Sequence, residues 1–192
     1  ARLGTIQLKA GRSRDVMGLA DTLLSTGSFA NAGNALGIPK VELSIPEFTY
    51  ILGGELFAFK GNFALGNLGE IESSKTGSEP VQTYYHQKSL YLRLGKPEWK
   101  LRFYGGFNHQ AFWSNGNKMY GDRYTVSPFQ TLTYIVSGKA YGTQSIESSK
   151  IGNHLGSIDL GFEITFPKTR LFAYRQNIYD VGGLARGDNI LD

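Results

Sequence analysis

The side chains that most often carry chemistry are sparse in this chain. It contains three histidines, His86, His109 and His154, and no cysteine. The histidines are far apart in sequence and lack the close spacing of zinc sites. Without cysteine there is neither a thiolate ligand nor a cysteine nucleophile. The sequence therefore predicts no metal site and no cofactor.

Catalysis by other side chains is also poorly supported. No nucleophile elbow, Ser-His-Asp order or phosphate-binding glycine loop can be recognised. Asp159 and Glu163 share a strand face, but four residues along a strand span about 13 Å, which exceeds the carboxylate separation of glycosidases. A carboxylate from another strand could complete such a pair, and an enzyme would need either that pair or a histidine dyad in the lumen. We therefore expect a protein that is not an enzyme.

The elements expected to position these side chains are β-strands. Glycine is abundant, with 25 residues, and aromatics make up 13% of the chain, as many strands joined by glycine-rich turns would require. Apolar and polar residues alternate with period two in 55–65, 87–94, 99–108 and 156–166, and more weakly in 4–10, 41–51 and 170–178. In 170–178 both faces carry apolar residues, so its facing stays open, and 41–51 is interrupted at Pro46.

The connections indicate the architecture. Short links at 53–54, 95–98 and 167–169 alternate with long segments at 11–40, 66–83 and 113–152. This asymmetry is typical of antiparallel transmembrane β-barrels, in which short turns lie on the periplasmic side and long loops outside. About seven strands are fewer than the eight of the smallest such barrel. We therefore expect an all-β chain in which residues 1–192 form one segment of a larger barrel, incomplete at both ends.

Segment 11–40 leaves one local alternative open. Apolar residues between Asp15 and Leu24 recur at roughly helical spacing. They would form either a helix folded over or into the barrel, or a loop with some apolar packing.

Charged residues on the polar strand faces would point into the barrel. They include Lys60, Arg93, Lys100, Arg102, Asp159 and Glu163. In an open pore they would set ion or solute selectivity, whereas in a plugged barrel they would pair with one another. The net charge of +4 is dispersed, without a run of like charges, so no nucleic-acid partner is expected.

The stretch FYGGFNHQAFW, residues 103–113, reads as a strand that crosses the membrane. Trp99 and Trp113 would mark the two aromatic girdles of the barrel. His109 has the parity of the lipid face, so it should either lie at the outer rim or be turned inward by a β-bulge. Aromatic, amide and basic groups near this end are candidates for binding sugar: Asn108, His109, Trp113, Tyr120, Arg123 and Tyr124.

Three segments resemble the Wzi-type capsule assembly family of Gram-negative outer-membrane proteins. They are IQLKAGRSRDVMGLADTLLSTGSFANAGNALGIPKVELSIPEF, HQKSLYLRLGKPEWKLRFYGGFNHQAFW and NHLGSIDLGFEITFPKTRLFAYRQNIYDVGGL. The most specific pieces are Gly105, Gly106, His109 and Trp113; Asn34, Ala35, Pro39 and Lys40; and Tyr174, Arg175 and Gln176. Many members of the family carry two adjacent histidines where this chain has Asn108-His109.

The resemblance implies a large barrel in the cell outer membrane that assembles capsule. Its role would be that of a lectin that binds exported polysaccharide and retains it at the cell surface, without catalysis. Its partners would be outer-membrane lipid, capsular or surface polysaccharide, and other outer-membrane assembly components. The alternative is a porin-like channel whose basic lumen, with Lys60, Arg93, Lys100 and Arg102, favours anions.

Overall fold

The computed structural model describes most of the 192 residues. These are residues 1–21, 27–28, 31–32, 35–51, 53–71, 80–114, 127–139 and 151–180. In these ranges no helix is long and apolar enough to span a membrane.

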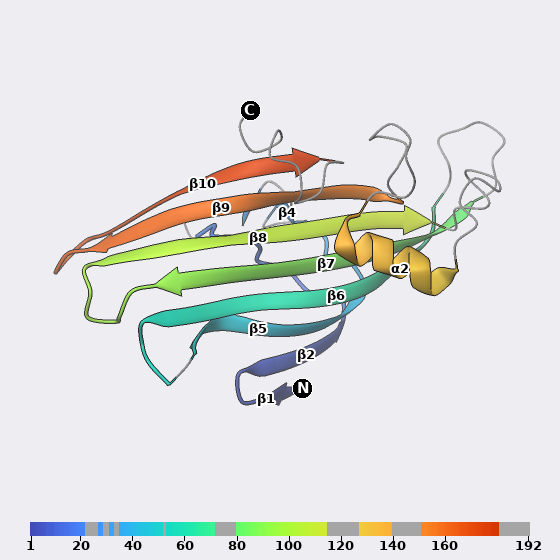
Figure 1. The fold of residues 1–192 in the computed structure, drawn as a ribbon. Coiled ribbons are helices and arrows are strands. Elements are labelled where there is room, and N and C mark those ends of the chain that lie inside the picture. The colour runs from blue at the N-terminus through green and yellow to red at the C-terminus, as the bar shows by residue number, and fades with distance from the viewer. Residues whose placement is uncertain are drawn as a thin grey trace.

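One antiparallel sheet dominates the structure (Figure 1). The strands are β1 (Arg2–Leu3), β2 (Ile6–Gly11), β3 (Gly27–Ser28), β4 (Asn31–Ala32), β5 (Lys40–Tyr50), β6 (Phe57–Ile71), β7 (Val81–Leu94), β8 (Leu101–Ser114), β9 (Asn153–Thr165) and β10 (Arg170–Asp180). The main sheet has eight strands in the order β1-β2-β5-β6-β7-β8-β9-β10, and β3 pairs with β4 separately. Because β1 and β10 are its edges, the sheet is not closed into a barrel.

The two faces of the sheet differ in chemistry, because alternate side chains point to opposite sides of a strand. The apolar face includes Leu43, Phe63, Leu92, Phe103 and Leu160, all at least 41% exposed. The polar face includes Glu42, Tyr91, Asn108, Ser157 and Asp159, all at most 5% exposed. The main sheet thus buries its polar face and exposes its apolar face.

The short turns lie at one end of the sheet, and the strand ends that lead into the long connections lie at the other (Figure 1). The links between β5 and β6, β7 and β8, and β9 and β10 are short, while those after β2, β6 and β8 are long. Register is continuous from β7 through β9, and it shifts in β5 between Ile45 and Thr49. Pro46 lies in that interval, where its missing N–H costs the ladder no hydrogen bond.

The helix α2 (Pro128–Ser137) interrupts the long connection between β8 and β9. Ser127 caps it: its hydroxyl accepts a hydrogen bond from the Gln130 backbone N–H, and the Gln130 side chain accepts one from the Ser127 N–H. Pro128 occupies the first turn, and Gly138 ends the helix in the left-handed conformation at φ 66°. These local signals start and stop the helix without any charged side chain.

All seven predicted strands are confirmed as β2 and β5 to β10, whereas the two-residue strands β1, β3 and β4 were not indicated by the sequence. The open facing of 170–178 is resolved, because Tyr174 pairs with Gly161 and Gln176 with Asp159 on the polar face. A helix starting at Asp15 is wrong for residues 15–21, which contain no helix. The rest of that possible helix, 22–24, lies outside the described residues. The prediction of an all-β, antiparallel chain is confirmed, and the main sheet is open, not closed into a barrel.

Candidate functional site

The centre of the polar face is a network around Asp159. The Asp159 carboxylate is fully buried and accepts hydrogen bonds from the Tyr91 hydroxyl at 2.7 Å and the Ser157 hydroxyl at 2.6 Å. The Asn108 side-chain amide donates to both hydroxyl oxygens, at 3.2 Å and 2.7 Å, and closes the ring of hydrogen bonds. Gln176 donates to Asp159 from β10 at 3.4 Å. Because buried carboxylates persist when donors satisfy them, this network is a cross-strand support and not a free acid or base.

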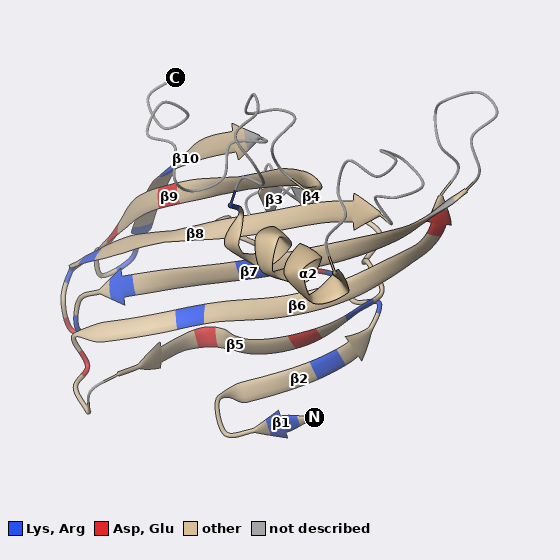
Figure 2. Cartoon of the chain, turned by 45° about the vertical axis from the view of Figure 1, so that its right-hand side comes forward, with Lys and Arg blue, Asp and Glu red and all other residues tan. Residues whose placement is uncertain are grey.

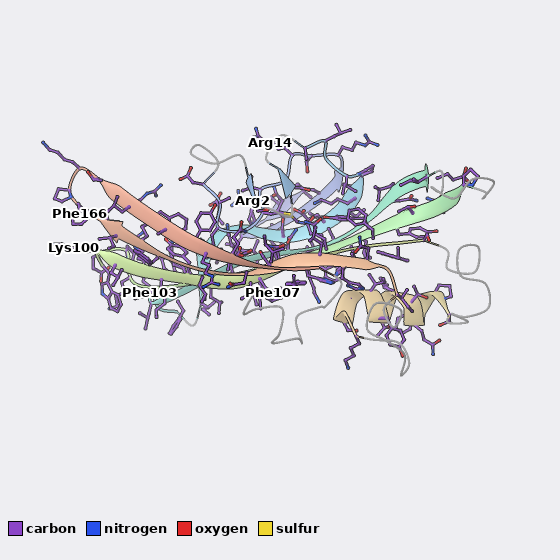
Figure 3. All side chains as sticks on the ribbon, turned by 90° about the horizontal axis from the view of Figure 1, so that it is seen from above. Arg2, Arg14, Lys100, Phe103, Phe107 and Phe166 are labelled. Atoms are coloured by element: carbon purple, nitrogen blue, oxygen red, sulfur yellow. The ribbon has the colours of Figure 1, made fainter. Side chains whose placement is uncertain are left out.

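Residues 12–21 cover this face, which explains its burial. Met17 and Leu19 are 5% and 6% exposed, and the Gly18 carbonyl oxygen accepts a hydrogen bond from Lys60 Nζ at 3.2 Å. A Cβ on Gly18 would lie 3.2 Å from the Asp159 carboxylate, and φ there is +75°. Glycine is thus the residue that lets the segment turn directly over the network. Figure 3 shows Arg14 on the side of the sheet opposite Phe103 and Phe107.

An ionic cluster anchors the same segment at its start. Lys40 Nζ lies 2.7 Å from Asp15 Oδ2 and 3.1 Å from Glu42 Oε2, and it donates to Gln87 Oε1 at 2.5 Å. Lys9 approaches Glu42 at 3.4 Å. The charges of two cations and two carboxylates therefore cancel in the long-loop half of the polar face. Lys40 belongs to one of the motifs that carry the family resemblance.

The three histidines, separated in sequence, come together on the apolar face beyond Phe107. His86 and His154 are both register partners of Ala111, and His109 precedes Ala111 by two residues. His109 Nε2 lies 2.8 Å from His154 Nδ1, and the ring centroids of His86 and His109 are 5.8 Å apart. All three are at most 1% exposed.

Hydrogen bonds assign the protons within this histidine cluster. His154 Nε2 lies 2.9 Å from the Ile151 carbonyl oxygen, which can only accept, so Nε2 carries a hydrogen; in the neutral ring, Nδ1 then accepts from His109 Nε2. His86 Nδ1 donates to the Ala64 carbonyl oxygen at 3.1 Å. Among the described residues no three or more His, Asp or Glu side chains are arranged to hold a metal ion. The direct nitrogen-to-nitrogen hydrogen bond leaves no room for one between His109 and His154.

Helix α2 lies on the same side of the sheet as Phe103 and Phe107 (Figure 3). Its C-terminal end reaches the histidine cluster, because a Cβ on Gly138 would lie 3.9 Å from His109 Nε2. Ile135 of α2 is fully buried, and Lys88, the register partner of His109, donates from Nζ to the Val136 carbonyl oxygen. A cation at the C-terminal end of a helix satisfies an open carbonyl and interacts favourably with the helix dipole. The helix therefore seals polar groups that would otherwise interrupt the exposed apolar face.

Two of the predicted sugar contacts are buried. Asn108 belongs to the Asp159 network and His109 to the histidine cluster, at 0% and 1% exposure. Trp113 is half-buried near the end of β8, with its ring centroid 5.6 Å from that of Tyr84. Tyr120, Arg123 and Tyr124 lie outside the described residues. No bulge occurs in the register of β8, so His109 keeps the parity of the apolar face.

The residues predicted to point into a barrel share one face. Arg93 pairs in register with Tyr104, and Arg102 with Glu163, to which Arg102 Nη1 also donates a hydrogen bond at 3.2 Å. Lys60 and Asp159 lie on this face as well, and Lys100 precedes β8 as an exposed residue. The prediction of mutual pairing fits Arg102 and Glu163, whereas Asp159 is bound by the uncharged side chains of Tyr91, Ser157 and Gln176. It does not fit Lys60 and Arg93.

Sequence reasoning missed the histidine cluster and α2. The histidine cluster forms because of the register in which the strands pair. That register cannot be inferred from three histidines that are far apart in sequence. The helix did have a local signal, because Ser127-Pro128-Phe129-Gln130 is a capping box with proline at the first position.

Comparison of the chain with known protein families, curated proteins and solved structures finds no match.

Proposed function

We propose that this chain is part of an outer-membrane β-barrel of the capsule-assembly type, which binds exported polysaccharide at its long-loop end and catalyses no reaction. The exposed apolar face of the sheet is the observation that carries the membrane part of the proposal. Apolar patches of this extent on a protein surface mark a surface that meets lipid or another protein. The burial of the opposite, polar face supports lipid, because barrels in membranes turn apolar residues outward and polar residues inward.

The dimensions of β8 support the same reading. From Trp99 to His109 is ten residues, which at a rise of about 3.3 Å and a tilt of about 40° cover roughly 25 Å. That height equals the apolar band of such barrels. Trp99, 46% exposed, lies at the short-turn end, and the polar histidine cluster begins where the band would end. A continuation of the chain would supply partners for the edges β1 and β10, since open edges are not tolerated in lipid.

The polysaccharide part of the proposal rests on the family resemblance and on the long-loop end of the sheet. Trp113 stands there beside Tyr84, and aromatic faces are surfaces on which sugar rings stack. Since Asn108 and His109 are buried, binding is assigned to Trp113 and to the following loop, with Tyr120, Arg123 and Tyr124.

Retention of capsule on cells tests this function. Replacing Tyr120, Arg123 and Tyr124 together with alanine should release polysaccharide from the cell surface into the medium. A matched control replaces Lys96 and Lys168, in the turns at the opposite end of the sheet, with alanine and should leave retention unchanged. Unchanged retention in the loop variant, at equal protein level, would refute the proposed role.

The membrane location has its own test, because the chain has no cysteine to interfere with labelling. A nitroxide at Leu160→Cys, at a position 61% exposed on the apolar face, should be accessible to oxygen and shielded from a water-soluble nickel reagent. A nitroxide at Lys96→Cys, in the turn between β7 and β8, should show the reverse. A water-exposed label at position 160 would contradict the barrel in lipid.

One observation favours the alternative, a channel with a basic lumen. Lys60 and Arg93 on the polar face have no carboxylate partner among the described residues. Against it, residues 12–21 cover that face. Planar-bilayer conductance separates the two functions: a steady anion-selective current would favour the channel, and its absence the plugged barrel.

A further inference from the structure

The short-turn half of the polar face carries an excess of positive charge. Figure 2 shows basic positions on the neighbouring strands β6 and β7 in this half of the sheet. Arg102 and Arg170 share the single carboxylate of Glu163, at 3.2 Å and 3.8 Å. Arg170 also approaches Asp21 at 3.7 Å. Asp159 is occupied by its own hydrogen-bond network.

Lys60 and Arg93 are held by aromatic rings. Lys60 Nζ and Arg93 Cζ each lie 5.2 Å from the ring centroid of Phe48, so the two charges are at most about 10 Å apart. Arg93 also lies 5.2 Å from the Tyr50 ring centroid. We name these four residues together with Tyr104, whose ring meets Phe48 edge-on at 5.5 Å, the aromatic–basic cluster.

The cations of this cluster are not neutralised within the part of the chain that the structure describes. Lys60 Nζ donates to the Gly18 carbonyl oxygen but to no carboxylate, and Arg93 Nε is buried without a hydrogen-bond partner. Two like charges at this separation repel, and the planar guanidinium of an arginine offers a carboxylate a fork of N–H donors. The site is therefore preorganised for an anion that arrives from outside.

The rings narrow the class of anion. Tyr50 is 40% exposed beside Arg93, and on β10 Tyr174, 36% exposed, lies in register with Gly161 and Tyr104. Partly exposed rings beside a planar donor suit a sugar ring that carries a carboxylate: the ring stacks on tyrosine, and the carboxylate binds the guanidinium in a bidentate manner. A small inorganic anion would use the charges and leave the rings without contact.

We propose that the aromatic–basic cluster is a binding subsite for a uronic-acid residue of an acidic polysaccharide. Arg93 binds the carboxylate, Lys60 adds charge, and Tyr50 and Tyr104 flank the sugar ring. The choice of a saccharide ligand rests on the proposed function. The subsite itself lies at the opposite end of the sheet from the loops assigned to capsule retention, so it adds a second contact for the polymer.

The test measures binding of tetragalacturonate to the intact protein in detergent micelles by calorimetry. Arg93→Gln and Lys60→Gln should each weaken binding at least tenfold, whereas Lys100→Gln, an exposed cation near the same end, should change it less than twofold. Maltotetraose, equally long and uncharged, should bind more weakly to the parent protein and equally to all variants. The unfolding midpoint of each variant is measured as well, because loss of the contacts of Arg93 with the Phe48 and Tyr50 rings could lower stability; weaker binding counts as a lost site only in a variant that is folded at the assay temperature.

Three results would overturn the proposal: no tetragalacturonate binding by the parent protein, equal losses in the Lys100 control, or competition by inorganic phosphate at the same concentration as tetragalacturonate. The last would identify a plain anion site. Failure of the capsule-retention experiment would leave these binding results intact, so failures of the two proposals are distinguishable.

Discussion

The adjacent glycines of β8 offer a matched pair of substitutions with opposite expected results. A Cβ added to Gly106, on the polar face, would overlap the Leu90 carbonyl oxygen and come within 2.7 Å of Tyr91 Cα, both backbone atoms of β7. A Cβ added to Gly105, on the apolar face, would meet the flexible end of Leu160 at 3.4 Å and the Asp159 carbonyl oxygen at 3.9 Å, both ordinary van der Waals contacts. We therefore expect Gly106→Ala to force β7 and β8 apart and Gly105→Ala to be accepted.

The magnitudes follow from these contacts. Overpacking costs about 1–3 kcal/mol, and replacing a strand glycine with alanine regains about 0.5–1 kcal/mol of chain entropy. Gly106→Ala should thus lose up to about 2.5 kcal/mol of unfolding free energy, while Gly105→Ala should be neutral or gain up to about 1 kcal/mol.

The assay is unfolding of the intact protein in detergent by guanidinium, followed by tryptophan fluorescence. With a slope on the order of 4 kcal/mol per molar guanidinium, a difference of about 2 kcal/mol separates the two midpoints by about 0.5 M. Equal midpoints, or a less stable Gly105→Ala variant, would show that β7 and β8 do not approach at Gly106 as the structure has them.

Two further predictions concern the two faces of the sheet. Lys88→Met removes the hydrogen bond to the last turn of α2, so amide exchange in α2 should accelerate at least tenfold by mass spectrometry, while Lys100→Met should leave it unchanged; equal protection in both would mean that Lys88 does not hold the helix. Asp159→Asn puts an amide donor against the hydroxyl donors of the polar-face network and should cost about 1–3 kcal/mol in the same guanidinium unfolding assay. Glu47→Gln, at an exposed carboxylate, is its control. If both variants lose equally little unfolding free energy, Asp159 does not stabilise the sheet.

The strands and their two faces could be predicted from the sequence because alternation is local. Leu101, Phe103 and Phe107 alternate with Arg102, Tyr104 and Asn108 along one strand, and covalent geometry alone sends them to opposite sides. The short turns were equally readable, since glycine and proline mark them through their backbone preferences. The capping box of α2 is local information of the same kind, because its side chains bond backbone groups within one helical turn.

The contacts between side chains of different strands depended on the register of several strands at once. His86 and His154 meet beside Ala111 only because β7 and β9 both pair with β8 in one alignment, and pairing is set by turn geometry and packing over the whole sheet. The burial of Asn108 and His109 likewise depends on the segments that cover the two faces. Residue types and their spacing therefore determined which face of the sheet each side chain takes. Only the tertiary structure decided which residues of distant strands lie next to one another on that face, because contacts between strands are non-local.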